Sequence, residues 1–408
     1  MKCRHCNQPL EHTFIDLQYA PPSNAYLSKE DLSLPEKYFP LKVRVCHHCW
    51  LVQTEDHAQA DELFNADYAY FSSTSESWLQ HAKQYALTIS RQLELGPKSF
   101  VTEVASNDGY LLKNFVDMGI PCLGIEPTDS TAQAAEQLGI PVLRDFFGEK
   151  LGQRLTQEGK QADLLIGNNV YAHVPDINDF TTGLKSALKP EGVITLEFPH
   201  LLQLINQTQF DTIYHEHFSY LSLGTVNRIF ECAGLRIWHV EELPTHGGSL
   251  RIFGCHAESQ RPTSPVVADI IKKEENCGLF ELTTYTGFQA KTNEIKDQLL
   301  LFLIEQKRAG KKVAAYGAAA KGNTLLNYAG IKPDLLPFVC DAAKAKQGKY
   351  MPGSHIPIFP PSTISDMTPD FLLILPWNIA EEVMSQQSHI RNWGGKFVIA
   401  VPKLTIID

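Results

Sequence analysis

The sequence predicts an α/β protein of three parts: a cysteine-rich N-terminal domain, a central Rossmann-like domain and a C-terminal Rossmann-like α/β domain. Three observations predict this arrangement. Two C-x-x-C pairs lie near the N-terminus, strand-like apolar runs alternate with amphipathic segments from Ser99 onward, and a second strand, turn and helix begins at Lys311. Strands that alternate with helices form βαβ units and a parallel sheet. We place the domains at 1–70, 71–282 and 283–408.

The composition is that of a folded protein. Of the 408 residues, 43% are hydrophobic and 20% are charged, which is enough chain for two or three domains with their own cores. The start, MKCRHCNQPL, lacks the basic and apolar regions of a secretion signal, and no apolar run is long enough to span a bilayer. We therefore expect a cytoplasmic protein without a membrane partner.

The charge of the chain bears on its partners. A formal net charge of −10 disfavours nucleic acid as a partner, because such binding needs a clustered basic face. An anionic small molecule needs only local positive potential and stays compatible with this charge. The sequence has no coiled-coil repeat and no obvious apolar surface helix, so we expect a monomer.

Four of the nine cysteines form the pairs Cys3/Cys6 and Cys46/Cys49. Two such knuckles bring four thiolates to the corners of a tetrahedron, which is the geometry of a closed structural zinc site. The pairs are farther apart than in a short zinc ribbon, so a neighbouring histidine is an alternative ligand at one corner: His5, His47 or His48. A redox C-x-x-C and a zinc ribbon that binds nucleic acid are the competing interpretations.

The remaining cysteines and the segment between the pairs predict no chemistry. In a reducing cytosol the scattered cysteines are expected to be buried small hydrophobic residues: Cys122, Cys232, Cys255, Cys277 and Cys340. The segment from Phe14 to Val45 contains four prolines and little periodicity. We expect loops there that depend on the metal for order.

The central domain starts a regular series of strands. The predicted strands are KSFVTEVAS, IPCLGIEP, IPVLRD, ADLLIGNN and GVITLEF, and the segments GYLLKNFVDMG and STAQAAEQLG between the first three predict helices. A parallel sheet binds its ligand at the carboxyl ends of the strands, where the first strand turns into its helix. The ligand site of this domain is therefore expected directly after KSFVTEVAS.

The first turn runs from Glu103 to Gly109. It resembles the acidic-x-Gly-x-Gly-x-Gly loop of class I S-adenosylmethionine methyltransferases, with Ala105, Asn107 and Gly109 at the three small positions. Only the last of these is glycine. Glu126 ends the second strand, where a carboxylate can hold both ribose hydroxyls of the cofactor.

Other strand ends extend the resemblance to these methyltransferases. Asp145 and Phe146 follow the third strand and suit the amino group and ring face of adenine, and Asn168 and Asn169 end the fourth strand at the same cofactor site. LKPEGVITLE resembles the helix end, turn and fifth strand of the family. An α/β domain that holds a dinucleotide, or no ligand, is the alternative.

A hairpin is expected to close the central sheet. PTHGGSLRIFGCH predicts an antiparallel edge strand, and LRIWHVEEL predicts its partner. The two glycines mark a bend at which a ligand or a backbone segment can approach closely. Arg251 on this strand is a candidate contact for an anionic substrate, with an exposed strand arginine as the alternative.

Two histidines, a glutamate and a tyrosine stand together at Tyr214-His215-Glu216-His217. His215 and His217 are two residues apart and do not share a helical face as the histidines of an H-E-x-x-H zinc site do. A metal site on an extended segment and a buried structural histidine remain alternatives. The favoured interpretation is acid–base chemistry, because imidazole titrates near neutrality and a carboxylate can tune it.

A base beside S-adenosylmethionine is needed when the methyl acceptor is carbon. Oxygen and nitrogen acceptors already carry a lone pair, whereas a carbon next to a carbonyl becomes nucleophilic only after its proton leaves. Tyr214, Glu216 and His217 could supply the base, its orienting partner and a donor to the enolate. His215, which points the other way along an extended segment, is expected to serve packing or support.

Over its whole length the chain resembles the S-adenosylmethionine-dependent C-methyltransferases that make branched-chain deoxysugars on nucleotide carriers. The segments that carry the resemblance are the four paired cysteines, EVASNDGYLL, GNNVYAHVPD, YHEHFSYLS, HGGSLRIFG and YGAAAKGNTLLN. The resemblance implies methylation at C3, less often C5, of a 4-keto-deoxy sugar linked to a nucleoside diphosphate. It implies that Tyr214 positions the sugar, Glu216 is its polar partner and His217 is the base. Tyr70 and His173 match residues that line the pocket.

The C-terminal domain predicts a site for the nucleotide carrier. An amphipathic run from Thr283 to Arg308 predicts one linking helix, and KKVAAYGAAAKGNTLLNYAG predicts a strand, a turn and a helix. The turn is not G-x-G-x-x-G, because Ala319 replaces the glycine that lets a pyrophosphate approach. Lys321 and the amides of Gly322 and Asn323 suit a diphosphate that binds at the N-terminal end of the predicted helix.

The same cleft is expected to include PWN (376–378), at the end of another strand. A degenerate Rossmann domain kept for structure is the alternative for this domain. For the whole chain, a nicotinamide-dependent oxidoreductase of nucleotide sugars and a zinc-ribbon binding module with vestigial enzyme domains are the alternatives.

Overall fold

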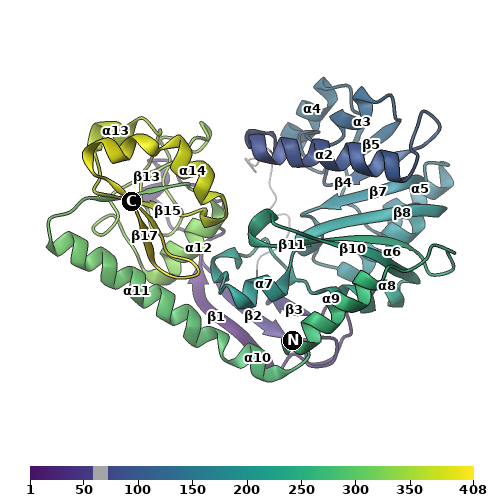
Figure 1. Cartoon of the computed structure of the whole chain (residues 1–408), viewed down its shortest axis with the longest axis horizontal. Helices are drawn as coiled ribbons and strands as arrows, with labels where there is room; N and C mark the ends of the chain where they lie inside the picture. Colours follow the sequence, from purple (N-terminus) through teal and green to yellow (C-terminus); the bar gives the residue numbers. More distant parts are fainter. Residues whose placement is uncertain (58–71) are drawn as a thin grey trace.

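The computed structural model describes residues 1–57 and 72–408 (Figure 1). A C-terminal lobe and a larger central lobe stand side by side, and a small sheet from the N-terminal part joins them at their base. The predicted α/β class with two mostly parallel sheets is confirmed. The domain boundaries that we placed in the sequence stay a prediction.

The N-terminal part folds into a four-stranded antiparallel sheet of order β1-β2-β3-β9. Its strands are β1 (His12–Ala20), β2 (Phe39–Val45), β3 (Val52–Thr54) and β9 (Ser219–Tyr220), with a short 3-10 turn η1 (Asp31–Ser33). The expectation of loops from Phe14 to Val45 is wrong where β1 and β2 pair. Phe14 is buried and stacks on Phe288 at 4.5 Å between ring centroids, so apolar packing orders this strand.

The central sheet has seven strands in the order β10-β11-β8-β7-β4-β5-β6. The strands are β4 (Val101–Val104), β5 (Cys122–Ile125), β6 (Val142–Leu143), β7 (Ala162–Asn168), β8 (Leu188–Pro199), β10 (Leu235–Leu243) and β11 (Ser249–His256). The prediction that 249–256 forms the edge is wrong. The hairpin folds so that β11 pairs antiparallel with both β8 and β10, and β10 becomes the edge.

Helices cover both faces of this sheet (Figure 1). They are α2 (Glu76–Gln92), α3 (Lys113–Asp117), α4 (Asp129–Gln137), α5 (Glu149–Gln157), α6 (Ile177–Ala187), α7 (Leu201–Asn206), α8 (Leu223–Cys232) and α9 (Pro265–Asn276). The short 3-10 turns are η2 (Ser72–Thr74), η3 (Tyr171–His173), η4 (Phe210–Thr212) and η5 (Thr245–Gly247). Ser75 starts α2, because its hydroxyl accepts from the Trp78 amide at 3.3 Å. Cys232 and Cys277, at the ends of α8 and α9, are exposed, so the prediction that they are buried is wrong.

The C-terminal lobe contains a six-stranded sheet of order β14-β13-β12-β15-β16-β17, parallel except for β17. Its strands are β12 (Val313–Tyr316), β13 (Val339–Cys340), β14 (Ile358–Phe359), β15 (Phe371–Ile374), β16 (Lys396–Ile399) and β17 (Thr405–Ile407). Its helices and 3-10 turns are α12 (Ala320–Ala329), α13 (Thr363–Met367), η6 (Trp377–Ile379), α14 (Ala380–Gln386) and η7 (Ser388–Trp393). The predicted linking helix is divided at Gly287 into α10 (Leu282–Thr286) and α11 (Phe288–Arg308).

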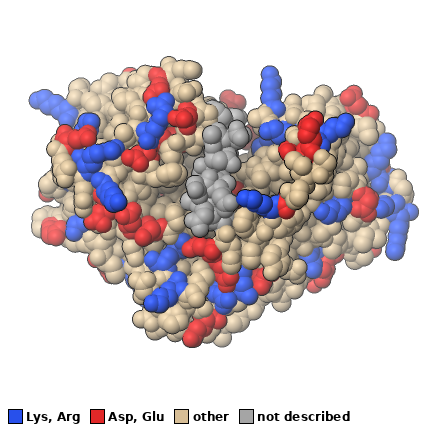
Figure 2. All heavy atoms as spheres, turned by 180° about the vertical axis from the view of Figure 1, so that it is seen from behind, with Lys and Arg blue, Asp and Glu red and all other residues tan. Residues whose placement is uncertain are grey.

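Two features of the whole fold bear on partners. Within the described ranges, none of the helices combines the length and the apolar composition that a bilayer span requires. On the face shown in Figure 2, Lys and Arg side chains are interspersed with Asp and Glu side chains over both lobes. This face therefore carries mixed charge.

Candidate active site

The segment Tyr214–His217 forms a tight turn between η4 and β9. The His217 amide donates to the Tyr214 carbonyl at 3.0 Å, so the segment is not extended as expected. The Thr54 hydroxyl of β3 donates to the His217 carbonyl at 2.6 Å. The Phe218 amide donates to the Ala172 carbonyl at 2.8 Å. The N-terminal sheet and the central domain thus both hold this turn.

His217 is a buried imidazole with a defined tautomer. Its Nδ1 donates to the Thr212 carbonyl at 2.8 Å, which leaves the lone pair on Nε2. Burial lowers the pKa of His217 well below its usual range, and the neighbouring His173 and Lys321 lower it further. The Tyr214 ring lies 4.1 Å from the His217 ring. His217 therefore stays neutral at physiological pH and presents Nε2 as a hydrogen-bond acceptor.

His215 and Glu216 point to the N-terminal part of the chain. His215 Nε2 lies 3.2 Å from the Pro40 carbonyl, and the described residues offer no ligand cluster that contains both His215 and His217. Glu216 is buried, its Oε1 accepts from Asn24 Nδ2 at 3.1 Å, and burial raises its pKa to about 7. These contacts favour support over metal binding for His215.

His173, a predicted pocket residue, contacts this turn directly. Its Nδ1 donates to the Glu216 carbonyl at 2.7 Å, and its ring lies edge-on to His217 at 4.6 Å. Burial lowers the pKa of His173 to about 4. Tyr70, the other predicted pocket residue, lies outside the described residues.

The C-terminal lobe reaches the same place through α12 and η6. Lys321 Nζ donates to Asn378 Oδ1 at 2.7 Å and lies 4.7 Å above the Trp377 ring. Trp377 Nε1 donates to Asp211 Oδ2 at 2.7 Å. Burial lowers the pKa of Lys321 to about 8 and raises that of Asp211 to about 6. The structure thus brings Lys321 and PWN together, next to the His217 turn.

The other predicted residues of α12 serve packing. Asn323 is buried and its Nδ2 donates to the Ser23 carbonyl at 2.5 Å. Gly322 packs so closely that an added Cβ would lie 2.8 Å from a methyl carbon of Leu375. The Asn323 amide donates to the Ala319 carbonyl at 3.1 Å, so the prediction that it meets a substrate is wrong, whereas the Gly322 amide stays a candidate.

The predicted cofactor loop adopts a left-handed backbone at every small position. The φ angles are 56° at Ala105, 50° at Asn107 and 78° at Gly109. Glycine is the usual residue at such angles, which explains the family pattern that this loop departs from. Glu126 is buried beside the loop, with Oε2 accepting from the Asn107 amide and Oε1 from the Thr128 amide, both at 2.9 Å.

The remaining predicted cofactor residues lie at neighbouring strand ends. Glu103 is buried in β4, and burial, with Asp108 and Glu126 nearby, raises its pKa well above the usual range. Asn168 is the last residue of β7, and Asn169 follows it. After β6, Asp145 is partly exposed and Phe146 is 59% exposed, so the Phe146 ring face is accessible.

Arg251 lies in a buried network of charges. One guanidinium nitrogen donates to Glu197 Oε2 at 2.7 Å, and the other donates to Glu241 Oε2 at 3.1 Å. Glu197 also contacts His81 at 3.0 Å and accepts from the Thr245 hydroxyl at 3.0 Å. This pairing favours Arg251 as support for Glu197 over a direct substrate contact.

The four paired cysteines converge on one point. Their sulfur atoms all lie within 4.8 Å of one another, and the contacts Cys3–Cys49 and Cys6–Cys46 are both 3.5 Å. Gln53 Nε2 donates to Cys3 Sγ at 3.2 Å. Four sulfur ligands with an outer hydrogen bond fit a tetrahedral structural zinc site. His5 instead contacts Asn178, at 2.8 Å.

Three family models match consecutive parts of the chain. They are "Putative zinc binding domain" at residues 3–64, "Methyltransferase domain" at residues 77–240 and "C-methyltransferase C-terminal domain" at residues 244–402. The chain is 33% identical to the C-methyltransferase NovU of Streptomyces niveus over 407 residues, which cover 100% of this chain and 97% of that protein. The chain belongs to the S-adenosylmethionine-dependent C-methyltransferases.

Solved methyltransferase structures resemble part of this C-methyltransferase. The magnesium protoporphyrin IX methyltransferase of Synechocystis PCC 6803 with bound SAH is 15% identical, with a TM-score of 0.34 over 44% of this chain and 82% of that one. An S-adenosylmethionine-dependent methyltransferase from Clostridium acetobutylicum is 10% identical, with a TM-score of 0.37 over 45% and 93%. Among the activities weighed from the sequence, membership of the family decides in favour of methyl transfer.

The C-methyltransferase uses S-adenosylmethionine, and the carboxyl edge of its central sheet fits that molecule. Several buried polar side-chain atoms there have no hydrogen-bond partner in the described part of the chain: Glu103 Oε2, Ser106 Oγ, Asp108 Oδ1 and both polar atoms of Asn168. Buried polar groups are rarely left unpaired unless a ligand or water pairs them. The ammonium and the hydroxyls of S-adenosylmethionine can supply these partners.

Sequence reasoning did not name two residues of the candidate site, Asp211 and His246, and it named Trp377 only within PWN. Asp211 and Trp377 meet across domains, which no sequence pattern reveals. His246 stands in the quoted segment HGGSLRIFG, and its place before two glycines was the available signal.

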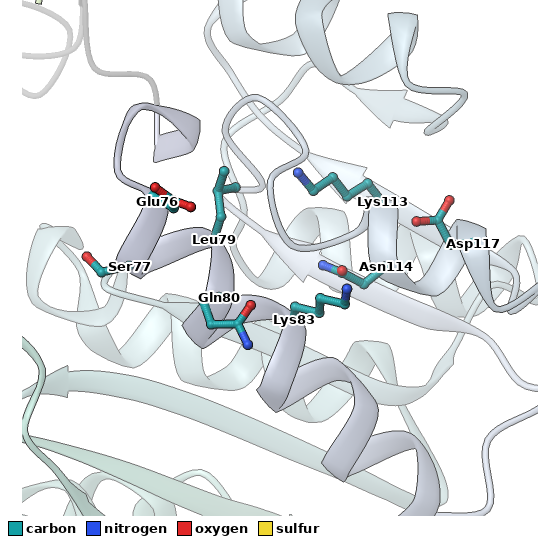
Figure 3. Close-up of a pocket in the computed structure, with 8 residues that line it drawn as sticks. All are labelled: Glu76, Ser77, Leu79, Gln80, Lys83, Lys113, Asn114 and Asp117. Carbon is teal, nitrogen blue, oxygen red and sulfur yellow. The ribbon is translucent and has the colours of Figure 1, made fainter.

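A separate cavity of about 550 Å³ lies between α2 and α3 (Figure 3). Its lining includes Lys83, Lys113 and Asn114. None of its lining residues is among those predicted from the sequence. Tyr85, also on α2, does not line it and is buried in the core. The cavity is therefore separate from the site around His217.

Proposed function

We propose that the protein transfers a methyl group from S-adenosylmethionine to C3, with C5 as the other candidate, of a 4-keto-deoxy sugar linked to a nucleoside diphosphate. The observation that carries the proposal is the state of His217. It is buried, neutral and holds its lone pair on Nε2 through the bond from Nδ1 to Thr212. A carbon acceptor needs such a base beside the methyl donor, because it has no electron pair for the methyl group until its proton leaves.

The reaction then has two steps at the sugar. S-adenosylmethionine supplies the electrophilic methyl group. His217 Nε2 takes the proton from the carbon next to the ketone, and the C–H electron pair forms the enolate. The enolate carbon then forms the new C–C bond with the methyl group as the methyl–sulfur bond breaks, S-adenosylhomocysteine is the leaving group, and the ketone is restored. The proton leaves His217 to solvent after the product departs.

Different domains bind different parts of the substrate. Lys321 and the Gly322 amide lie in the first turn of α12, a place suited to the diphosphate. Tyr214 and His173 pack against the base and position the sugar, and Glu216 acts as their polar partner. We expect the enzyme to act in the cytoplasm as a monomer.

The test is a mass-spectrometric screen of nucleotide-linked 4-keto sugars for the gain of one methyl group. We expect His217→Asn to lower turnover by about 100-fold to 10,000-fold, the usual contribution of a general base, with S-adenosylhomocysteine still bound. A variant with near-normal turnover would remove His217 as the base. Thermal stabilisation by NAD(H) but not by S-adenosylhomocysteine would contradict the use of S-adenosylmethionine as the methyl donor.

A further inference from the structure

We propose that His246 donates a hydrogen bond from Nδ1 to the substrate oxygen that becomes negatively charged when the enolate forms. The inference rests on the proposed function, because it concerns the same ketone. It assigns a second task at the site, next to proton removal by His217. His246 lies in η5, the turn between β10 and β11.

The tautomer of His246 is fixed by one contact. Asn169 Nδ2 donates to His246 Nε2 at 3.2 Å. The Nε2 lone pair is thereby used, so the neutral ring carries its proton on Nδ1. Burial lowers the pKa of His246 to about 4, and the charge of Lys321 acts in the same direction. Among residues 1–57 and 72–408, no group accepts from this Nδ1–H.

His246 lies between the carboxyl edge of the central sheet, the C-terminal lobe and the turn that carries His217. Asn169 follows β7, at the carboxyl edge that binds the ligand in a parallel sheet. The His246 ring lies edge-on to Trp78 of α2 at 5.3 Å. Next to it, Gly247 is so close to the C-terminal lobe that an added Cβ would lie 2.4 Å from Trp377 Cη2. His246 is also near enough to His217 to affect its ionisation.

The backbone holds the ring in a strained position. His246 has φ 53° and ψ 24°, a left-handed conformation that is strained for a non-glycine residue. The Thr245 hydroxyl donates to Glu197 Oε1 at 3.0 Å, and Gln209 Nε2 donates to the Gly247 carbonyl at 2.8 Å. Such strain persists where the surroundings fix it, and it is concentrated at functional sites.

The chemistry requires a donor of this kind. As the C–H bond breaks, the proton moves to His217 Nε2, a C=C bond forms and the carbonyl π pair moves onto oxygen. A buried neutral imidazole is a weak base, so this transfer depends on stabilising the oxygen charge. His246 keeps its proton throughout, and its hydrogen bond is strongest in the enolate. When the C–C bond forms, the C=O bond is restored.

The test separates proton removal from methyl transfer. The wild-type protein is incubated with S-adenosylhomocysteine and the keto sugar in D₂O, and deuterium uptake at the carbon next to the ketone is measured. Methylation rates are measured in parallel. The variants His246→Asn and His246→Asp are compared. The Asn and Asp side chains have the same shape as each other, and both residues tolerate a left-handed backbone, but only Asn offers an N–H donor.

We expect His246→Asp to lower both rates by about 100-fold or more, the usual effect of losing one oxyanion donor. We expect His246→Asn to recover at least part of the loss, while S-adenosylhomocysteine affinity stays within about twofold in both variants. His239→Asn on the edge strand β10 is the matched control and should leave both rates unchanged. Should His246→Asp fail to fold, His246→Ala replaces it as the variant without a donor.

Exchange and methylation at wild-type rates in the variant without a donor would overturn the inference. Equal losses in the Asn and Asp variants together with weakened S-adenosylhomocysteine binding would also overturn it, because they would indicate a structural role. A wild-type protein that neither exchanges nor methylates any keto sugar would contradict the proposed function instead.

Discussion

At the scale of single residues, the site depends on which ring nitrogen of each histidine carries the proton. Thr212 accepts from His217 Nδ1, and Asn169 donates to His246 Nε2. Both contacts select the tautomer with the proton on Nδ1, but they occupy different nitrogens, so His217 presents the Nε2 lone pair and His246 presents the Nδ1–H. Burial lowers the pKa of both rings, and neither has to lose a proton before it can act at neutral pH.

Glu216 gives a prediction about stability and pH. Burial raises its folded-state pKa to about 7 from its usual 4.5, so its contribution to stability is fully present below about pH 4.5 and is lost as the pH rises through about 7. We expect Glu216→Gln to match the ligand-free wild type near pH 4.5. At pH 8 we expect it to be more stable by up to about 3 kcal/mol.

Urea unfolding at the two pH values measures this difference. Glu275→Gln, on the exposed side of α9, is the control and should change stability by less than about 0.5 kcal/mol at either pH. A Glu216→Gln variant that loses stability at pH 8 would show that the ionised carboxylate is stabilising there.

At the scale of elements, the turn η5 joins the hairpin β10–β11 to the C-terminal lobe. Gly247 has φ 85°, and a Cβ there would lie 2.4 Å from Trp377 Cη2 and 2.7 Å from Gln209 Nε2. The absence of a side chain lets Trp377 reach Asp211, to which it donates at 2.7 Å. The glycine therefore sets the distance between two domains.

We expect Gly247→Ala to displace Trp377 and to lower kcat/KM for the keto sugar by about 100-fold, because a shift of about 1 Å in a positioning group can cost that much. Affinity for S-adenosylhomocysteine, measured by calorimetry, should be unchanged. Gly394→Ala is the matched control, since Gly394 has φ 77° but no atom within 4 Å of the added Cβ. It should lose about 1 kcal/mol of stability and keep its kcat/KM; equal kinetics in the two variants would contradict the steric argument.

Elements with a local signal could be predicted from the sequence. The strands that start at Val101 and Val313 and the helix after Gly317 lie where the pattern placed them, because alternating apolar runs and turn residues are local. The place of β11 inside the sheet could not be predicted, since a hairpin pattern does not say which strand pairs with β8. β1 was missed because its burial depends on Phe288, which is far away in sequence.

The residues of the candidate site also fall into those with a local sequence signal and those that depend on distant contacts. Glu103, Glu126 and His217 could be named as candidates from the sequence, because strand ends and a short motif mark them. Asp211 and His246 were missed, because their importance comes from contacts with Trp377 and Asn169, and these contacts exist only in the folded chain.

At the scale of the whole molecule, every domain holds the turn that carries His217. Thr54 of the N-terminal sheet donates to the His217 carbonyl at 2.6 Å, and Thr324 of α12 donates to the Ile213 carbonyl at 2.8 Å. Asn24 donates to Glu216 at 3.1 Å. The proposed base, His217, is therefore held by contacts from the N-terminal and C-terminal domains, although it belongs to the central part of the chain.

This arrangement predicts that zinc controls catalysis from a distance. The knuckle Cys46/Cys49 leads directly into β3, which pairs with β9 through Gln53 and Ser219 and holds His217 through Thr54. We expect about one zinc ion per chain, and we expect its removal by a chelator to cost on the order of 5 kcal/mol or more in the N-terminal domain. The displaced β3 would release the His217 turn.

Zinc content, thermal unfolding and deuterium exchange at the sugar measure the effect together. We expect the zinc-free protein and Cys46→Ser to lose exchange before they lose S-adenosylhomocysteine binding, because β4 and its loop do not depend on β3. Cys277→Ser, which changes an exposed cysteine outside the cluster, should keep the zinc and both activities. Zinc-free protein with unchanged unfolding temperature and unchanged exchange would show that the four thiols neither stabilise the fold nor position the base.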